Sequence, residues 1–299
     1  MTELLVGTRK GLFVLGGEPG AAFAIRKRMF IGDPVDYAMR EPHSGRWFAA
    51  VTSPFWGPRI WFSDDLEGDW QPAAGVSLPK GGEQALKRIW AIVSSDDGSR
   101  LWAGGDPGVL FQSRDGGASW QLNRALYEHP TRPRWRPDSG GLSVHSIAPW
   151  PGDPDRLALA ISAAGVWLTD DGGESWSHGN EGIVADYLPE QARATAIDLC
   201  VHHLERAPRR PERLYLQFHG GVYRSDDGGR SWVSIAAARE PTSSCTSARP
   251  RARSSARATP GAAGSASRAG CRRSRRCASR PVDRPSSTAT PTRQQPRGV

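Results

Sequence analysis

The chain has 299 residues, of which 38% are apolar and 23% charged, with four cysteines and a formal net charge of +8. This composition fits one large soluble domain or two smaller ones. No apolar run reaches the roughly 18 residues of a membrane span, so no membrane partner is expected. The N-terminus also lacks a basic region followed by a long apolar one, and the expected location is therefore cytoplasmic.

The charge is distributed unevenly along the chain. Residues 241–299 contain 13 of the 39 Lys and Arg but only one of the 31 Asp and Glu, which leaves 26 basic and 30 acidic side chains in residues 1–240. The body is therefore mildly acidic, and the basic pI of about 9.8 comes from the tail. This excludes a nucleic-acid interface spread over the whole chain and leaves nucleic acid as a partner of the tail alone.

Pairs of short β-type runs recur along the body. The first pair is residues 4–7 and 11–14, and further pairs are residues 100–104 with 108–111, 155–160 with 165–168, and 212–216 with 221–224. Alternating apolar residues between Gly, Pro and Asp at this spacing predict antiparallel strands, about four in each repeating unit.

An eight-residue pattern follows each of the three later pairs, and we call it the box. It has Ser or Thr first, Asp third, Gly fifth and Trp eighth, and it begins at Ser113, Thr169 and Ser225, at intervals of 56 residues. A weaker copy begins at Ser63 and lacks the glycine at its fifth position. Repetition at a fixed period of this length is typical of repeat folds such as propellers.

The residues of the box suit a hairpin turn. The carboxylates can accept hydrogen bonds from turn N–H groups, the glycines can adopt positive φ, and each Trp offers a large apolar surface that holds the turn against its sheet. The predicted role is structural rather than catalytic or metal-binding for the three sets concerned: Asp115, Gly117 and Trp120; Asp171, Gly173 and Trp176; Asp227, Gly229 and Trp232.

The box resembles the Asp box, or BNR repeat, of the sialidase-like β-propeller superfamily, and the resemblance covers roughly residues 1–238. The run 141–176 is similar to bacterial BNR-repeat proteins often labelled glycosyl hydrolase or exo-sialidase. The resemblance implies an all-β propeller of four-stranded antiparallel blades, about seven in number. The sequence supplies about five, namely a partial blade at about 3–28 and fuller ones at about 35–71, 88–122, 143–179 and 197–236.

The β pattern stops near residue 240. Of the 59 residues in 241–299, 51 are Arg, Ser, Ala, Pro, Thr or Gly, a composition that cannot build an apolar core. We therefore expect two parts, an incomplete propeller at 1–238 and a disordered low-complexity tail at 239–299. Two alternative explanations fit the tail: a frameshift in a GC-rich gene, or a genuine basic arm.

Propeller topology predicts where a functional site lies. With strands named A to D in each blade, the boxes mark one end, and the B–C and D–A connections lie at the opposite end, where function is expected. Two of these connections stand out. The first combines arginines with aromatic residues and yields Arg134, Trp135 and Arg136, whereas the second places Asp186 beside Tyr187.

These two connections suggest a site for an anion or a carbohydrate, with Arg binding a carboxylate and Trp stacking on a ring. Asp186, Tyr187 and Arg134 are the catalytic candidates, and Trp135 and Arg136 are candidates for ligand binding. The alternative interpretation is a proline-stiffened surface loop with solvated charges.

The histidines follow the repeat. His145 and His202 are 57 residues apart and occupy equivalent positions in adjacent blades, Trp90 fills the same position one blade earlier, and His219 falls in a B–C loop at the same end. The three histidines are further ligand-binding candidates. Cys200 stands two residues before His202, so a zinc or iron site is conceivable, but no local C-x-x-C or H-x-x-x-H spacing supports it. No metal and no cofactor are expected.

The sequence favours a ligand-binding or assembly scaffold with a carbohydrate, a small anion or a protein as its partner. The alternative is a glycoside hydrolase of sialidase-like type at the end opposite the boxes. A sialidase needs an arginine cluster, a Tyr nucleophile and an Asp acid/base, and the sequence gives no clear match. A two-acid glycosidase could use Asp106, Asp138 or Asp186, although nothing in the sequence singles out a pair.

Overall fold

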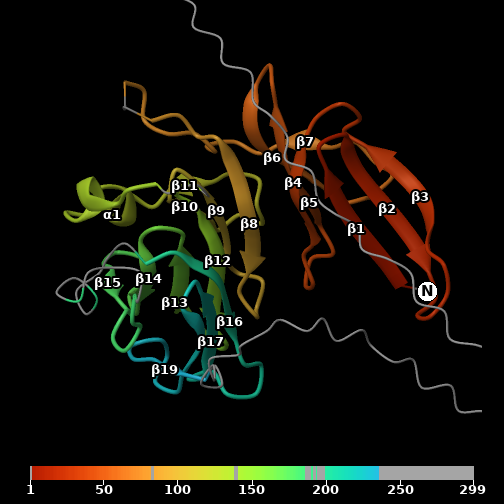
Figure 1. The fold of residues 1–299 in the computed structure, drawn as a ribbon. Helices are drawn as coiled ribbons and strands as arrows, with labels where there is room; N and C mark the ends of the chain where they lie inside the picture. The colour runs from red at the N-terminus through yellow and green to blue at the C-terminus, as the bar shows by residue number, and fades with distance from the viewer. Residues whose placement is uncertain are drawn as a thin grey trace, which may run out of the picture. The chain divides into compact units, whose positions relative to one another are not determined.

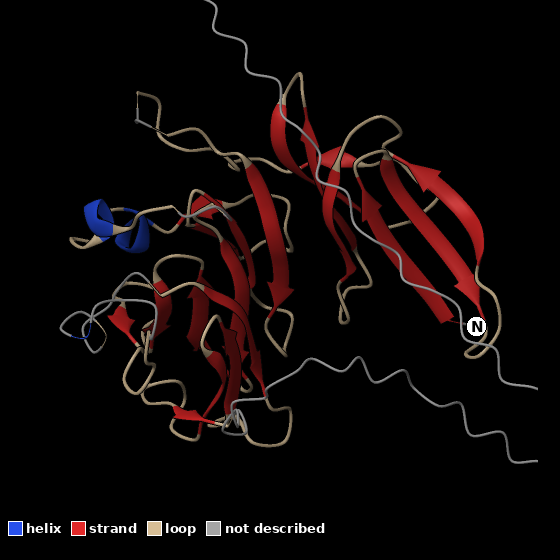
Figure 2. Ribbon diagram, viewed as in Figure 1, coloured by secondary structure: helices blue, strands red, loops and turns tan. Residues whose placement is uncertain are grey.

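The computed structural model describes residues 2–81, 84–137, 141–185, 190, 193 and 199–235. Its described part is built from β-strands with two very short helical segments (Figures 1 and 2). All the described strands belong to one unit of the chain, Met1–Thr242. The tail 239–299 lies outside the described residues. In the described part, neither helical segment is long enough to cross a membrane.

The strands form five antiparallel sheets in chain order, as the repeats predict. The first sheet has three strands, β1 (Thr2–Thr8), β2 (Gly11–Gly17) and β3 (Ala24–Met29). Four sheets of four strands follow: β4 (Val35–Arg40), β5 (Trp47–Ser53), β6 (Gly57–Ser63) and β7 (Gln71–Pro72); β8 (Arg88–Ser94), β9 (Leu101–Asp106), β10 (Val109–Ser113) and β11 (Gln121–Leu122); β12 (Val144–Trp150), β13 (Asp153–Ile161), β14 (Gly165–Thr169) and β15 (Ser177–His178); β16 (Val201–Arg206), β17 (Leu214–Phe218), β18 (Gly221–Ser225) and β19 (Val233–Ser234).

Successive sheets pack against one another through their first strands. β4 contacts β8, β8 contacts β12 and β12 contacts β16. The second strand of each four-stranded sheet except the last contacts the first strand of the next sheet, and β1 contacts β4 in the same way. The three strands of the first sheet therefore correspond to the second, third and fourth strands of the others. This repeated packing of small antiparallel sheets is that of β-propeller blades.

Apolar side chains between the sheets form the core. Trp102 and Trp167 are completely buried and belong to one cluster, which joins the third and fourth sheets. A second cluster, around Phe218 and Trp232, joins the fourth and fifth sheets. Each sheet therefore buries its apolar surface against its neighbour rather than within itself, as in repeat proteins generally.

The boxes form the turns between the third and fourth strands, as predicted. In the box at Ser113, Asp115 Oδ1 accepts the N–H of Ser119 at 3.0 Å, and the N–H of Gly117 donates to Ser113 Oγ at 2.9 Å. The indole of Trp120 donates to the Gly117 carbonyl at 3.0 Å. The glycines at the fifth position have φ of +84°, +90° and +100° in the three boxes. The boxes thus stabilise hairpin turns.

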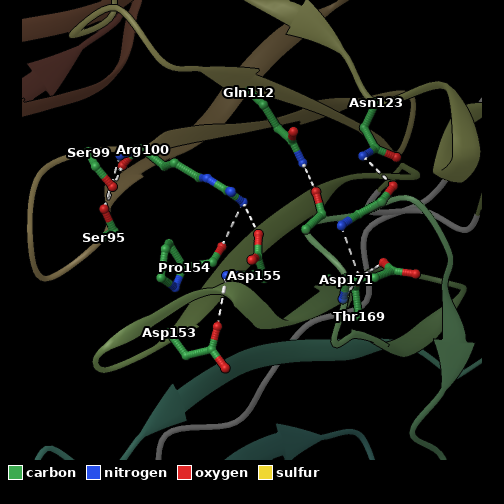
Figure 3. Close-up of polar contacts among 12 residues, drawn as sticks. Ser95, Ser99, Arg100, Gln112, Asn123, Asp153, Pro154, Asp155, Thr169 and Asp171 are labelled. Atoms are coloured by element: carbon green, nitrogen blue, oxygen red, sulfur yellow. Dashed lines mark hydrogen bonds and ion pairs between the residues drawn. The ribbon is translucent and has the colours of Figure 1, made fainter.

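Polar side chains of the third sheet also join it to the box of the fourth sheet (Figure 3). Gln112 donates to the carbonyl of Gly172 at 3.0 Å, and Asn123 donates to that of Gly173 at 2.9 Å. Nearby, Arg100 pairs with Asp155 at 2.6 Å. These contacts hold neighbouring sheets together at the end where the boxes lie.

The connection after β11 contains two helical segments that the sequence analysis did not predict. They are α1 (Arg124–Tyr127) and the 3-10 turn η1 (Arg132–Arg134). Asn123 caps α1 by accepting the N–H of Leu126 at 2.9 Å, and Leu126 itself is buried. A capping side chain followed by one buried anchor is enough to order this short turn.

Candidate functional site

The first strand of each four-stranded sheet, which we call the inner strand, has a β-bulge near its start. The pairing register shifts between Val35 and Tyr37 in β4, between Ile89 and Ala91 in β8, between Val144 and Ser146 in β12, and between Val201 and His203 in β16. The extra residues are Asp36, Trp90, His145 and His202, which we call the bulge row. Bulges change the direction of side chains and are frequent next to functional sites.

The bulge row lies at the end of the sheets opposite the boxes. In the second sheet, Val35 pairs with Val51, and the adjoining turn between β5 and β6 is closed by the pair Ser53 and Gly57. The other four-stranded sheets repeat this arrangement. The turns between second and third strands therefore adjoin the start of the inner strands, as the sequence predicts. The equivalence of Trp90, His145 and His202 is also confirmed.

Direct contacts connect the inner strands of neighbouring sheets. Nε2 of His145 lies 2.6 Å from the carbonyl oxygen of Val201, and Arg206 donates to the carbonyl of Ala148 at 3.1 Å. The two contacts progress in the same direction along β12 and β16, so these strands run parallel. The inner strands of the fourth and fifth sheets therefore bring their bulges side by side.

His145 is a half-buried member of the row. Burial lowers the pKa of its imidazole to about 4, and the nearby His202 and His203 contribute in the same direction. The ring is therefore neutral at pH 7, and its contact with a carbonyl requires the proton on Nε2. His145 thus serves as a hydrogen-bond donor that holds the backbone of β16 at Val201.

Asp36 and Trp90 are the bulge-row residues of the second and third sheets, and the Arg88 side chain lies beside both of them. The Thr52 hydroxyl donates to Asp36 Oδ2 at 2.6 Å, and an Arg88 nitrogen lies 3.8 Å from Asp36 Oδ1. The Arg88 guanidinium also lies 4.9 Å from the centre of the Trp90 ring, which is 37% exposed. An accessible indole is thus flanked by a cation and a carboxylate.

A second carboxylate lies opposite Arg88. Asp106 pairs with Arg88 in the register of β8 and β9 and is buried, with 7% of the residue exposed. Within the described part of the chain, its Oδ1 has no hydrogen-bond donor, and the Lys87 ammonium lies 3.6 Å away. Burial raises the pKa of the Asp106 carboxyl, an effect that the charges of Lys87 and Arg88 only partly oppose.

A groove of about 710 Å³ lies along the connection that carries α1 and η1. Tyr127, His129, Trp135 and Arg136 are among the residues that line it. Arg132 lines it too, but its guanidinium donates to the carbonyls of Pro107 at 2.6 Å and Gly108 at 2.8 Å. The groove is therefore attached to the turn that follows Asp106.

Trp135 forms the wall of this groove with little of its surface exposed. Only 4% of the residue is accessible, its ring packs at 4.9 Å from that of Trp167, and its indole nitrogen donates to Thr131 at 3.2 Å. Arg136 lines the groove directly. Burial lowers the pKa of the His178 imidazole to about 4, and the charges of His129 and Arg134 act in the same direction.

The remaining sequence candidates divide into two groups. Asp186, Tyr187 and Asp138 lie outside the described residues. The structure brings His202 and His219 together, with ring centres 4.4 Å apart, and a cysteine and two histidines here offer metal-binding atoms: Cys200, His202 and His219. The turn between β5 and β6, at the same end of its sheet, carries Phe55 and Trp56 with exposed fractions of 84% and 68%.

Asp36 and Arg88 are not among the residues predicted from the sequence. If the repeats are aligned, Asp36 falls at the position equivalent to Trp90. Each of the two follows a buried branched residue, Val35 or Ile89. The signal is only one residue long, and without the pairing register it is indistinguishable from ordinary strand alternation.

The fold defines a protein of the β-propeller class. No protein-family model and no curated protein matches the chain. Among solved structures it is similar to an ancestral GH74 enzyme (19% identity, TM-score 0.47), covering 68% of this chain and 24% of that one. It is also similar to the GH74 xyloglucanase from Xanthomonas campestris (16%, 0.44; 80% and 42% covered) and to YCF48 bound to D1 peptide (14%, 0.44; 75% and 60%). The chain thus spans less than two thirds of each of these structures.

Proposed function

We propose that the chain is a ligand-binding propeller domain whose bulge row binds a carbohydrate. The observation that carries the proposal is the repeated bulge, which gives each of four inner strands an extra residue at one end of its sheet. The resemblance of the boxes to Asp boxes supports the placement of the chain among sialidase-like propellers. In that interpretation the boxes are structural, and the ligand binds at the opposite end.

The side chains around Trp90 suit a sugar. The C–H face of a pyranose packs on an exposed indole, and its hydroxyl groups can donate to Asp36 and accept from Arg88. Both charged groups are already oriented, Asp36 by Thr52 and Arg88 by the ring itself. A site whose side chains are held in place before binding loses less conformational entropy when the ligand arrives.

The adjoining groove offers further contacts for a longer ligand. Arg136, His129 and Tyr127 line it, and Arg132 ties the groove to the turn after Asp106. We therefore extend the proposed site from the bulge row to Arg136, with His145, His202 and His219 at the side of the fifth sheet. In this proposal Trp135 contributes shape through its packing on Trp167 rather than an open stacking surface.

Titration calorimetry with neutral gluco-oligosaccharides and with sialyllactose tests the proposal. We expect the neutral sugars to bind, and Trp90→Ala to weaken the binding by about tenfold or more, because burying an aromatic ring is worth at least about 1.4 kcal/mol. Tyr215→Ala is the matched control, since Tyr215 is 38% exposed and lies on β17 outside the bulge row. Absence of heat with every sugar, or equal losses in both variants, would reject the proposal.

A glycoside hydrolase is the second candidate, and Asp106 is the observation that favours it. A buried carboxyl with a raised pKa suits a general acid, while Asp36, near Arg88 and hydrogen-bonded to Thr52, supplies the second carboxyl of the pair. This pair replaces the choice that the sequence left open among Asp106, Asp138 and Asp186.

Release of a fluorescent leaving group from aryl β-glycosides and aryl sialosides distinguishes the two functions. A hydrolase predicts turnover that Asp106→Asn reduces by roughly 100-fold or more, as is usual for loss of a general acid, whereas Asp69→Asn on the exposed box turn has no effect. Sugar binding without turnover leaves the chain as a binding domain. Turnover that persists in Asp106→Asn would show that this carboxyl is not the acid.

A further inference from the structure

Three side chains of the fifth sheet bring potential metal ligands together. Cys200 directly precedes β16, His202 is the bulge residue of that strand, and His219 lies in the turn between β17 and β18. The Cys200 sulfur and one ring nitrogen from each histidine all lie within 4.8 Å of one another. We propose that Cys200, His202 and His219 bind a zinc ion, a property that shares His202 and His219 with the proposed carbohydrate site but does not depend on carbohydrate binding.

The donor set favours zinc among the divalent ions. One thiolate and two neutral imidazoles form a mixed soft and borderline set of the kind that tetrahedral zinc accepts, whereas magnesium and calcium require oxygen ligands. Zinc–nitrogen and zinc–sulfur bonds of about 2.0–2.3 Å place tetrahedral ligand atoms about 3.5 Å apart. Because the three atoms lie within 4.8 Å of one another, each pair needs to approach by at most about 1.3 Å.

The fold allows this small movement. Cys200 is buried, with 8% of its surface accessible, so the thiol has a fixed position in the wall of the site. His202 and His219 are both exposed, and their rings already meet edge to face with centres 4.4 Å apart. Rotation of two exposed side chains towards one buried sulfur costs little compared with a change in the backbone.

Cys200 and His202 stand two residues apart, a spacing that extended backbone places on one side of the chain. Val201, between them, is fully buried in the core, and its carbonyl accepts the hydrogen bond from His145 in the neighbouring sheet. The backbone between the two proposed ligands is therefore held from both sides. Such support from outside the ligands is characteristic of metal sites and raises their affinity.

Within the described part of the chain, the three protein ligands leave the fourth tetrahedral position open. Because both histidines are exposed while the cysteine is buried, this position faces solvent, where water or an anionic group can bind. Structural zinc sites normally use four protein ligands, whereas sites that bind a further molecule use three. We therefore assign the proposed ion a ligand-accepting role rather than a purely structural one.

Cobalt substitution tests the site directly. Cobalt(II) added to the purified full chain should give a thiolate-to-cobalt charge-transfer band that saturates at one equivalent and disappears when zinc is added in competition. The other three cysteines, Cys245, Cys271 and Cys277, can also supply thiolates, so the titration is repeated with all three changed to Ser. The band should persist in that variant and be lost in Cys200→Ser.

Histidine variants provide a test that leaves the buried cysteine intact. His202→Gln and His219→Gln should each weaken zinc affinity by at least roughly tenfold, the lower end of what even outer-shell substitutions cost. His203→Gln is the matched control, because His203 is the next residue of the same strand and contacts Ser146 and Glu205 instead. No band in the wild type, a band unaffected by Cys200→Ser, or equal losses in all three histidine variants would overturn the proposal.

Discussion

At the scale of single residues, Asn123 makes more connections than any pattern in its sequence suggests. Its side chain is buried and caps α1 through Leu126, donates to Gly173, and accepts the indole N–H of Trp176 at 3.0 Å. One amide therefore joins the third sheet, the connection that bears the groove and the box of the fourth sheet.

We expect Asn123→Ala to lower the free energy of unfolding by about 2–4 kcal/mol, since the substitution leaves a buried indole N–H and two backbone groups without partners. Urea denaturation followed by circular dichroism measures the change. Gln121→Ala, two residues earlier and exposed on β11, is the control and should change stability by less than about 0.5 kcal/mol. Similar losses in the two variants would contradict the role of Asn123.

The box carboxylates should link stability to pH. Hydrogen bonds from Ser175 and from Thr169 lower the pKa of Asp171 to about 2. For Asp227, burial acts to raise the pKa, but hydrogen bonds from Ser231 and others outweigh it and the pKa is again about 2. Carboxyls with a pKa lower than the unfolded value of about 3.9 stabilise the fold above about pH 4, and this contribution is lost as the pH falls towards 2.

The double variant Asp171→Asn with Asp227→Asn tests this linkage. Between pH 7 and pH 3 the wild type should lose more stability than the variant, because the variant no longer has these two groups to protonate. Urea midpoints at several pH values give the comparison, with Asp69→Asn as a control that should follow the wild type. Parallel curves for wild type and double variant would show that the box carboxylates do not contribute.

At the scale of elements, the fifth position of the box requires glycine for two separate reasons. Gly117 has φ of +84°, and a Cβ built there would lie 2.3 Å from the ring of Phe48 in the preceding sheet. Gly152 also has positive φ, +75°, but nothing lies within 4 Å of its Cβ position. The pair separates backbone strain from the close approach between sheets.

Gly152→Ala should cost about 1–2 kcal/mol from backbone strain alone. Gly117→Ala should cost a further 1–3 kcal/mol or so, because Phe48 must move within a packed core. Thermal or urea unfolding of the two variants supplies both values. Equal destabilisation would mean that the box turn tolerates a methyl group against the neighbouring sheet, and that its glycine serves the turn alone.

The elements also show which features the sequence could predict. The strands, the box turns and the equivalence of His145 with His202 follow from local patterns that repeat, and all three are observed. The bulge at Asp36 and the interactions of Arg132 depend on pairing between segments distant in sequence. Composition and spacing do not contain that register, so the polar part of the bulge row escaped prediction.

At the scale of the whole molecule, the first and last sheets both carry apolar side chains on an exposed face. Leu4, Leu15 and Ile25 are cross-strand neighbours in the first sheet, and Leu4 and Ile25 are 43% and 49% exposed. On the fifth sheet, Tyr215 and Val233 flank Arg224 and are 38% and 64% exposed. Among the described strands, β2 alone pairs with β1, so the other edge of β1, where the other sheets have their first strand, is open. Apolar faces and open strand edges of this kind promote association.

We therefore expect the full chain to self-associate, and the combined change Leu4→Lys with Ile25→Lys to shift it towards the monomer, because two charges on this face oppose its burial. Sedimentation velocity over a range of protein concentrations measures the shift. Ile31→Lys is the control, since Ile31 is 77% exposed in the turn after β3, away from the row formed by Leu4 and Ile25. It should leave the association unchanged.

A wild type that stays monomeric and melts in one sharp transition would mean that the exposed faces are compatible with a stable monomer. That result would remove the reason to seek a partner that covers them. Association reduced equally by all the lysine variants would point to a general effect of charge, whereas a response confined to the double variant would locate the contact on the face of the first sheet.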